Sequence, residues 1–160
     1  MADIGTTRKR LEMQGFHGLD DATLAEIGPW MRWSPALCTT VMVAGVLWAS
    51  PPLLWSLALT AVVGAVLSRH PFDYLYNHGV RHWTGTRALP PNGAPRRFAC
   101  ALGTAWLGAA GLAFHLGAIT AGYALGGALI AVAGLVSFTH YCIPSLIYQT
   151  LFARRTASQA

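Results

Sequence analysis

The chain has 160 residues, of which 54% are hydrophobic and only 11% are charged, and its formal net charge is +5. Soluble domains carry about 25% charged residues, so this composition excludes an ordinary water-soluble fold and favours a protein embedded in lipid. Anionic lipid head groups account for the excess of basic residues, and we therefore expect no nucleic-acid partner.

The first 34 residues predict a polar extension with one short helix. Residues 1–18 are polar and contain glycine, which is typical of a loosely held tail. Asp20 is a suitable N-cap for a helix that begins directly after it. Gly28-Pro29 then ends this helix after about two turns.

Four apolar runs predict four transmembrane helices arranged as two helical hairpins. A crossing needs roughly 20 residues, which the last two runs provide and the first two, with about 14 and 15 residues, do not provide alone. Ser50-Pro51-Pro52 joins the first pair, because proline stops a helix. The runs are Ala36–Ala49, Leu53–Leu67, Phe98–Ile119 and Ala121–Tyr148.

All charged residues lie outside these runs, and two hairpins would place them on one side of the membrane. The positive-inside rule assigns that side to the cytoplasm. We therefore predict a multi-pass protein of the bacterial inner membrane with both termini cytoplasmic. The segments are an extension (1–34), hairpin 1 (35–67), a cytoplasmic loop (68–97), hairpin 2 (98–150) and a cytoplasmic tail (151–160).

The cytoplasmic loop predicts an interfacial amphipathic helix that ends at Thr84-Gly85-Thr86. Apolar side chains recur there at helical spacing, with polar residues between them. We expect four of them, with Trp83 the largest, to contact the membrane, the bundle or a partner protein: Phe72, Leu75, Tyr76 and Trp83.

Two further groups of residues predict membrane or partner contacts. Trp30 and Trp33 are interfacial anchors at the entry to the first run. Gly122 and Gly126 form a GxxxG pair, whose small residues let two helices approach closely. Packing of the fourth run on the third is the favoured interpretation of this pair, and docking onto another subunit is the alternative.

His115 and His140 lie within the last two runs, where an ionisable residue is a functional candidate. A hydrogen bond to a neighbouring helix is the simpler interpretation of each. The alternative is axial ligation of haem or a chlorophyll-type pigment. Gly111, one turn before His115, is small enough to admit a flat macrocycle.

Cys38, Cys100 and Cys142 each lie near the charged end of a predicted span, so they could meet at one membrane depth. Packing as small buried residues is the favoured interpretation. Cys142 is also a candidate reactive thiol, because His140 lies nearby in the sequence and could lower the pKa of that thiol. The chain contains no zinc-binding spacing, and we expect no metal.

Three motifs together resemble a known family: His70-Pro71-Phe72-Asp73, Pro95-Arg96-Arg97-Phe98-Ala99 and Cys142-Ile143-Pro144-Ser145. The chain resembles, over about residues 36–150, a bacterial family of small four-helix integral membrane proteins of unknown function. Relatives often have a Cys-x-x-Cys pair where this chain has Cys142 and Ser145. The resemblance implies no established activity.

The predicted function is that of a non-catalytic accessory or scaffold subunit in a larger photosynthetic or respiratory membrane complex. Its expected partners are lipids and other integral membrane subunits, and no cofactor is expected. Two alternatives remain open. One is a thiol redox or sulfur-handling membrane protein centred on Cys142, and the other is a pigment- or haem-binding subunit that uses His115 or His140.

Overall fold

The computed structural model describes residues 4–153, and all of the regular structure in that range is helical. The α-helices are α1 (Ile4–Met13), α2 (Asp21–Ile27), α3 (Trp33–Leu47), α4 (Pro51–Val66), α5 (Pro71–Leu75), α6 (Arg81–Thr84), α7 (Ala94–His115), α8 (Ile119–Thr139) and α9 (Ile143–Tyr148). A 3-10 turn (Trp30–Arg32) leads into α3, and π-helical turns follow α5 (Tyr76–Val80) and α9 (Gln149–Ala153).

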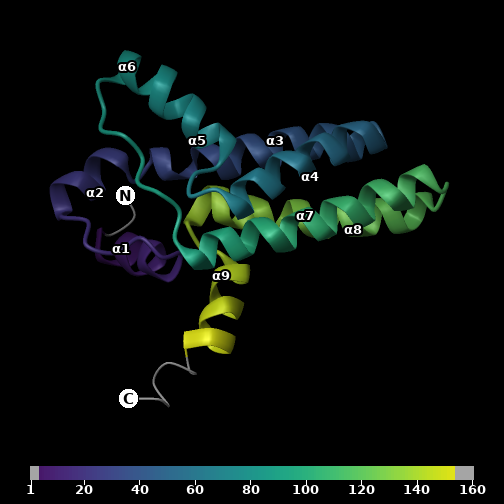
Figure 1. The fold of residues 1–160 in the computed structure, drawn as a ribbon. Coiled ribbons are helices and arrows are strands. Elements are labelled where there is room, and N and C mark those ends of the chain that lie inside the picture. Colours follow the sequence, from purple (N-terminus) through teal and green to yellow (C-terminus); the bar gives the residue numbers. More distant parts are fainter. Residues whose placement is uncertain (1–3, 154–160) are drawn as a thin grey trace.

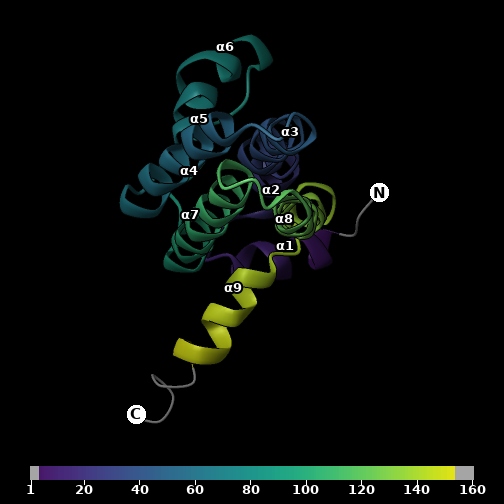
Figure 2. The ribbon, with the colours of Figure 1, turned by 90° about the vertical axis from the view of Figure 1, so that its right-hand side faces the viewer.

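Helices α3, α4, α7 and α8 lie side by side and form the body of the molecule (Figure 1). The closest neighbours are α4 with α7, α3 with α8, and α7 with α8. Viewed end-on, these four helices surround one core (Figure 2). The buried core residues include Met42, Val46, Leu54, Leu57, Leu107, Ala110, Phe114 and Leu129.

Two helices are long and apolar enough to cross a membrane, namely α7 with 22 residues and α8 with 21. Helix α4 meets the same test only together with the following helix Pro71–Thr84, from which it is bent by 80°. Helix α3 has 15 residues, or about 22 Å at 1.5 Å per residue. Two helices, or up to three, are therefore candidate membrane spans by length and composition.

The end of the bundle opposite the two chain reversals is covered by α1, α2, α5 and α6, and we call it the charged end (Figure 1). It has a second core, whose buried residues are Leu11, Phe16, Leu24, Ile27, Met31, Tyr76 and Leu89. The loose tail predicted for residues 1–18 is wrong from Ile4 onward. Helix α1 is present there, and Leu11 is 1% exposed, because its side chain helps to fill this core.

Local signals located several helix ends correctly. Asp20 caps α2 and accepts a hydrogen bond from the Thr23 backbone N–H. Gly85 ends α6 in the left-handed conformation, which glycine adopts without strain. The fourth apolar run was predicted to continue to Tyr148, but α8 ends at Thr139 and a break over residues 140–142 precedes α9.

Candidate functional site

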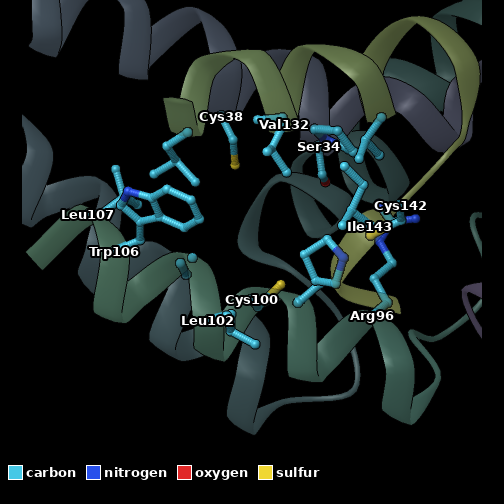
Figure 3. A pocket seen from close by; sticks show the side chains of 18 of the residues that line it. Ser34, Cys38, Arg96, Cys100, Leu102, Trp106, Leu107, Val132, Cys142 and Ile143 are labelled. Carbon is cyan, nitrogen blue, oxygen red and sulfur yellow. The ribbon is translucent and has the colours of Figure 1, made fainter. Parts of the chain in front are cut away.

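A cavity of about 340 Å³ lies between α3, α7, α8 and α9, near the charged end (Figure 3). Its volume is typical of a small-molecule site. Most of its walls are apolar, with Leu102 and Trp106 from α7 and Val132 from α8. Its polar lining residues are few and lie toward the charged end: Gln14, Ser34, His70 and Arg96.

All three cysteines line this cavity. Cys38 projects into it from α3, Cys100 from α7 and Cys142 from the start of α9 (Figure 3). All three thiols are free, and Cys142 is 7% exposed. Cys100 is close enough to interact electrostatically with both Cys38 and Cys142. The three cysteines, which were expected to lie near one end of the spans, therefore share one cavity.

His70 lies beside two of the thiols, a contact that the sequence did not reveal. Its Nε2 is 3.8 Å from Cys38 Sγ, and its Nδ1 accepts the Phe72 backbone N–H at 3.3 Å. The neutral ring therefore carries its proton on Nε2 and donates it toward the sulfur. Gly64 makes room for this arrangement, because a Cβ there would lie 2.4 Å from His70 Cδ2 and 3.4 Å from Cys100 Sγ.

A buried carboxylate fixes the backbone of His70. Asp73, which is 2% exposed, accepts hydrogen bonds from Ser34 Oγ at 2.5 Å and from Asn92 Nδ2 at 3.3 Å. Asp73 also accepts a hydrogen bond from the backbone N–H of His70, and this bond completes a capping box at the start of α5. Burial lowers the pKa of His70 to about 4, so the ring is neutral at physiological pH. Asp73 thus orients His70 without placing a charge in the cavity.

Arg96 brings a positive charge to the cavity wall. It is 7% exposed, its guanidinium lies 5.3 Å from the centre of the Phe16 ring, and Nη2 donates to the Met31 carbonyl at 3.4 Å. Within residues 4–153 it forms no ion pair; the pairs there are Arg8 with Asp21 and Arg87 with Glu26. A buried charge is costly unless it is paired, so Arg96 is a strong candidate for contacting a ligand.

The break after α8 borders the cavity through Cys142. His140 adopts a left-handed conformation with φ of 61°. It was predicted to lie inside a span, but it lies directly after the end of α8. Its Nε2 accepts from Arg32 Nε at 2.7 Å, and its carbonyl accepts from Gln14 Nε2 at 2.7 Å. Burial, followed by the nearby charges of Arg32 and Arg96, lowers the pKa of His140 to about 4.

The space beside His115 that was expected to admit a macrocycle is occupied by Trp55. A Cβ at Gly111 would lie 2.5 Å from Trp55 Nε1, and the rings of Trp55 and His115 have centroids 5.4 Å apart. His115 and His140 also lie at opposite ends of the bundle, since α7 ends at one and α8 at the other. Gly111 therefore serves the packing of α4 on α7.

The four loop residues predicted to contact the membrane, the bundle or a partner lie in different surroundings. Tyr76 is fully buried, whereas Leu75 and Trp83 are 56% and 93% exposed. A π-helical turn begins at Tyr76, and the extra residue per turn rotates the helix face. Phe72 packs on the core of the four-helix body. Phe72 and Tyr76 therefore contact the protein interior, whereas Leu75 and Trp83 are left for the membrane or a partner.

The predicted interface tryptophans and glycines make contacts within the chain. Trp30 and Trp33 pack on Tyr76, with ring centroids 5.2 and 6.2 Å away. A Cβ at Gly122 would meet Phe114, and one at Gly126 would lie 2.5 Å from Val46 Cγ2. The GxxxG pair thus lets α8 approach α7 and α3, which is the intramolecular interpretation rather than the docking alternative.

These features define a class of small helical protein with candidate membrane spans and a buried cavity that three thiols line. The model of the family "Domain of unknown function (DUF4395)" matches residues 29–153, and the chain belongs to this family. The resemblance to a family of unknown function, inferred over about residues 36–150, is therefore confirmed. No curated protein and no solved structure matches the chain.

Proposed function

We propose that the protein performs thiol chemistry, as a redox or sulfur-handling protein, on a small molecule that enters the cavity from the membrane. The observation that carries this proposal is the convergence of Cys38, Cys100 and Cys142 on one cavity. These residues come from three elements far apart in sequence, and simple core packing does not require three thiols to share a cavity. His70 supplies an N–H donor that faces Cys38 Sγ at 3.8 Å, so one polar group is directed at the thiols.

The proposed setting is the bacterial inner membrane, with α3, α4, α7 and α8 as four crossings and both termini in the cytoplasm. The basic residues of the described range support it, because they belong to α1, the turn before α3, the central loop and the start of α7. The positive-inside rule assigns such an end to the cytoplasm. The two short helices α3 and α4 would be accommodated by local thinning of the bilayer.

Oxidation of the purified protein tests the thiol proposal. Treatment of the reduced protein with diamide should join Cys100 to Cys142 or to Cys38, because Cys100 is the neighbour of both. The two thiols lose two protons and two electrons in total, and the N=N bond of diamide takes them up and is reduced to a hydrazine. Intact mass and peptide mapping would detect the bond.

Cys100→Ser should abolish this disulfide, whereas Cys38→Ser and Cys142→Ser should each leave one pair able to form. Denatured protein treated in the same way is the control for reagent activity. Three free thiols in the folded protein, with ready oxidation of the denatured protein, would contradict the proposal.

Ser145 provides a gain-of-function test. It is fully buried, and its hydroxyl has no hydrogen-bond partner among the described residues. Ser145→Cys removes this unsatisfied group and places a second thiol three residues after Cys142, the spacing of redox-active Cys-x-x-Cys motifs. We expect diamide then to join Cys142 to the new thiol at the expense of Cys100. Unchanged pairing in peptide maps would show that the start of α9 cannot hold a dithiol.

The accessory-subunit role stays a second proposal, in which integral membrane subunits of a larger complex would contact the exposed side chains of Trp83 and Phe138. Their exposed fractions, 93% and 80%, are large for aromatic residues. Co-purification in mild detergent tests it, and a monodisperse monomer with no associated complex would contradict it. A Soret or near-infrared band that His115→Ala or His140→Ala abolishes would instead favour the pigment alternative.

A further inference from the structure

The cavity has the two-ended character of a site for an amphiphile. Arg96 lies toward the charged end, and the α7 and α8 walls beyond it are apolar (Figure 3). Leu102, Trp106 and Val132 line this apolar part. A ligand that is polar at one end and apolar along its length matches this distribution, since each part then meets its preferred surroundings.

The polar end favours a negative charge. Arg96 is buried, and the one hydrogen bond that its guanidinium makes within residues 4–153 is the 3.4 Å contact with the Met31 carbonyl. Asp73 borders the same small pocket as Arg96, but its oxygens are engaged by Ser34, Asn92 and the His70 backbone. The neighbouring Arg32 adds a second positive charge beside His140. An anionic head group would pair directly with the Arg96 guanidinium, which forms no ion pair within residues 4–153.

The apolar part is open along the side of the bundle. Helices α7 and α8 are the two candidate membrane spans, and they form opposite walls of the cavity. Ile143 and Ile147 of α9, which line it, are 37% and 41% exposed. The cavity is therefore open to the surroundings beside α9, and a lipid-like molecule can enter it there.

We infer that the cavity binds a single-chain amphiphile with an anionic head, a carboxylate or a phosphate. The anionic head group pairs with Arg96, and the alkyl chain of the amphiphile lies between α7 and α8 along Leu102 and Val132. This inference rests on the proposed function, because it names the substrate class of the thiol-lined cavity.

Binding is tested with 11-(dansylamino)undecanoic acid, whose fluorescence rises in apolar surroundings, on the full chain in a neutral detergent. Dodecanoate and dodecyl phosphate should displace the probe. Dodecanol should be weaker by about tenfold or more, because it lacks the charge-assisted contact with Arg96. Equal displacement by dodecanol would overturn the inference. So would displacement by phosphatidylglycerol vesicles without displacement by either single-chain anion.

Two matched pairs of variants locate the site. Arg96→Gln should weaken dodecanoate binding about tenfold or more, whereas Arg97→Gln should not, because Arg97 donates to the Ala65 and Val66 carbonyls outside the cavity. Gly103→Phe should block the space for the alkyl chain of the ligand, since Gly103 lines the cavity and has open space at its Cβ. Gly108→Phe is its control on the same helix, with equally open space outside the cavity lining.

Unchanged binding in Gly103→Phe would overturn the inference even if Arg96→Gln failed to fold. The two proposals are separated by their readouts on the unmodified, reduced protein. Displacement of the probe by dodecanoate, together with three thiols that diamide leaves free, would support the amphiphile site and contradict the thiol proposal. Disulfide formation without displacement of the probe by dodecanoate would do the reverse.

Discussion

Tyr76→Ala should release the N-terminal segment from the charged end and lower stability there by about 3–5 kcal/mol, the range for truncating a large buried aromatic side chain. Tyr76 is 0% exposed and packs against Trp30 and Trp33. Its side chain joins α1 and α2 to the helix of the central loop within the second core. Limited proteolysis and hydrogen exchange of residues 4–32 would measure the release.

The matched control is Tyr74→Ala, on the same helix, where the side chain is 38% exposed and stacks on His78. It should cost much less, because little buried surface is lost. Equal protection of residues 4–32 in both variants would show that the N-terminal segment does not depend on the second core. The four-helix body should persist in each case, since its core is a separate cluster.

Acidification from pH 7 to about 4 should destabilise the folded structure around the break between α8 and α9, at residues 140–142. The pKa of His140 falls from 6.5 to about 4 on folding, so the folded state favours the neutral ring. The resulting stability is fully present above pH 6.5 and is lost as the pH falls toward 4, because the unfolded chain takes up the proton first. The difference corresponds to about 3 kcal/mol.

The pKa of His140 depends on its burial and on three neighbouring arginines. Burial has the largest effect, and the positive charges of Arg32, Arg96 and Arg10 then oppose protonation. His70 adds a parallel contribution, since burial also lowers its pKa to about 4. Asp73 opposes that shift by favouring the protonated ring.

Thermal unfolding in detergent across this pH range would measure the loss. His140→Asn should make the curve flatter, because asparagine tolerates the left-handed backbone and does not titrate. The exposed His17 is the matched control, and His17→Asn should leave the pH dependence unchanged. A pH profile of His140→Asn that superimposes on that of the unmodified protein would contradict the assignment.

Much of the architecture follows from interactions between residues that are close together in the sequence. Apolar runs became helices, Pro51 follows the first chain reversal, Asp20 caps α2, and Gly85 ends the loop helix. These outcomes depend on neighbouring residues, so they can be read from short windows. Family membership was also visible, because its motifs are contiguous in sequence.

Local signals failed where distant residues override them. The fourth apolar run continues past Thr139, yet Arg10 and Arg32 of the N-terminal segment hold the carbonyls of Thr139 and Phe138 and stabilise a break there. The amphipathic pattern in the loop did not reveal the π-helical turn at Tyr76. In both places, contacts between remote segments outweigh the preference for a regular helix.

The sequence by itself determined the composition of the candidate site, namely three cysteines near one end of the apolar runs and arginines beside them. Only the tertiary structure decided their arrangement. The Cys38–His70 contact spans 32 residues, and the Arg32–His140 contact spans 108. Neither separation leaves a periodic signal in the chain. The close approach depends on the missing side chain of Gly64, and the cavity exists because packing of α3, α7, α8 and α9 leaves space that no local preference encodes.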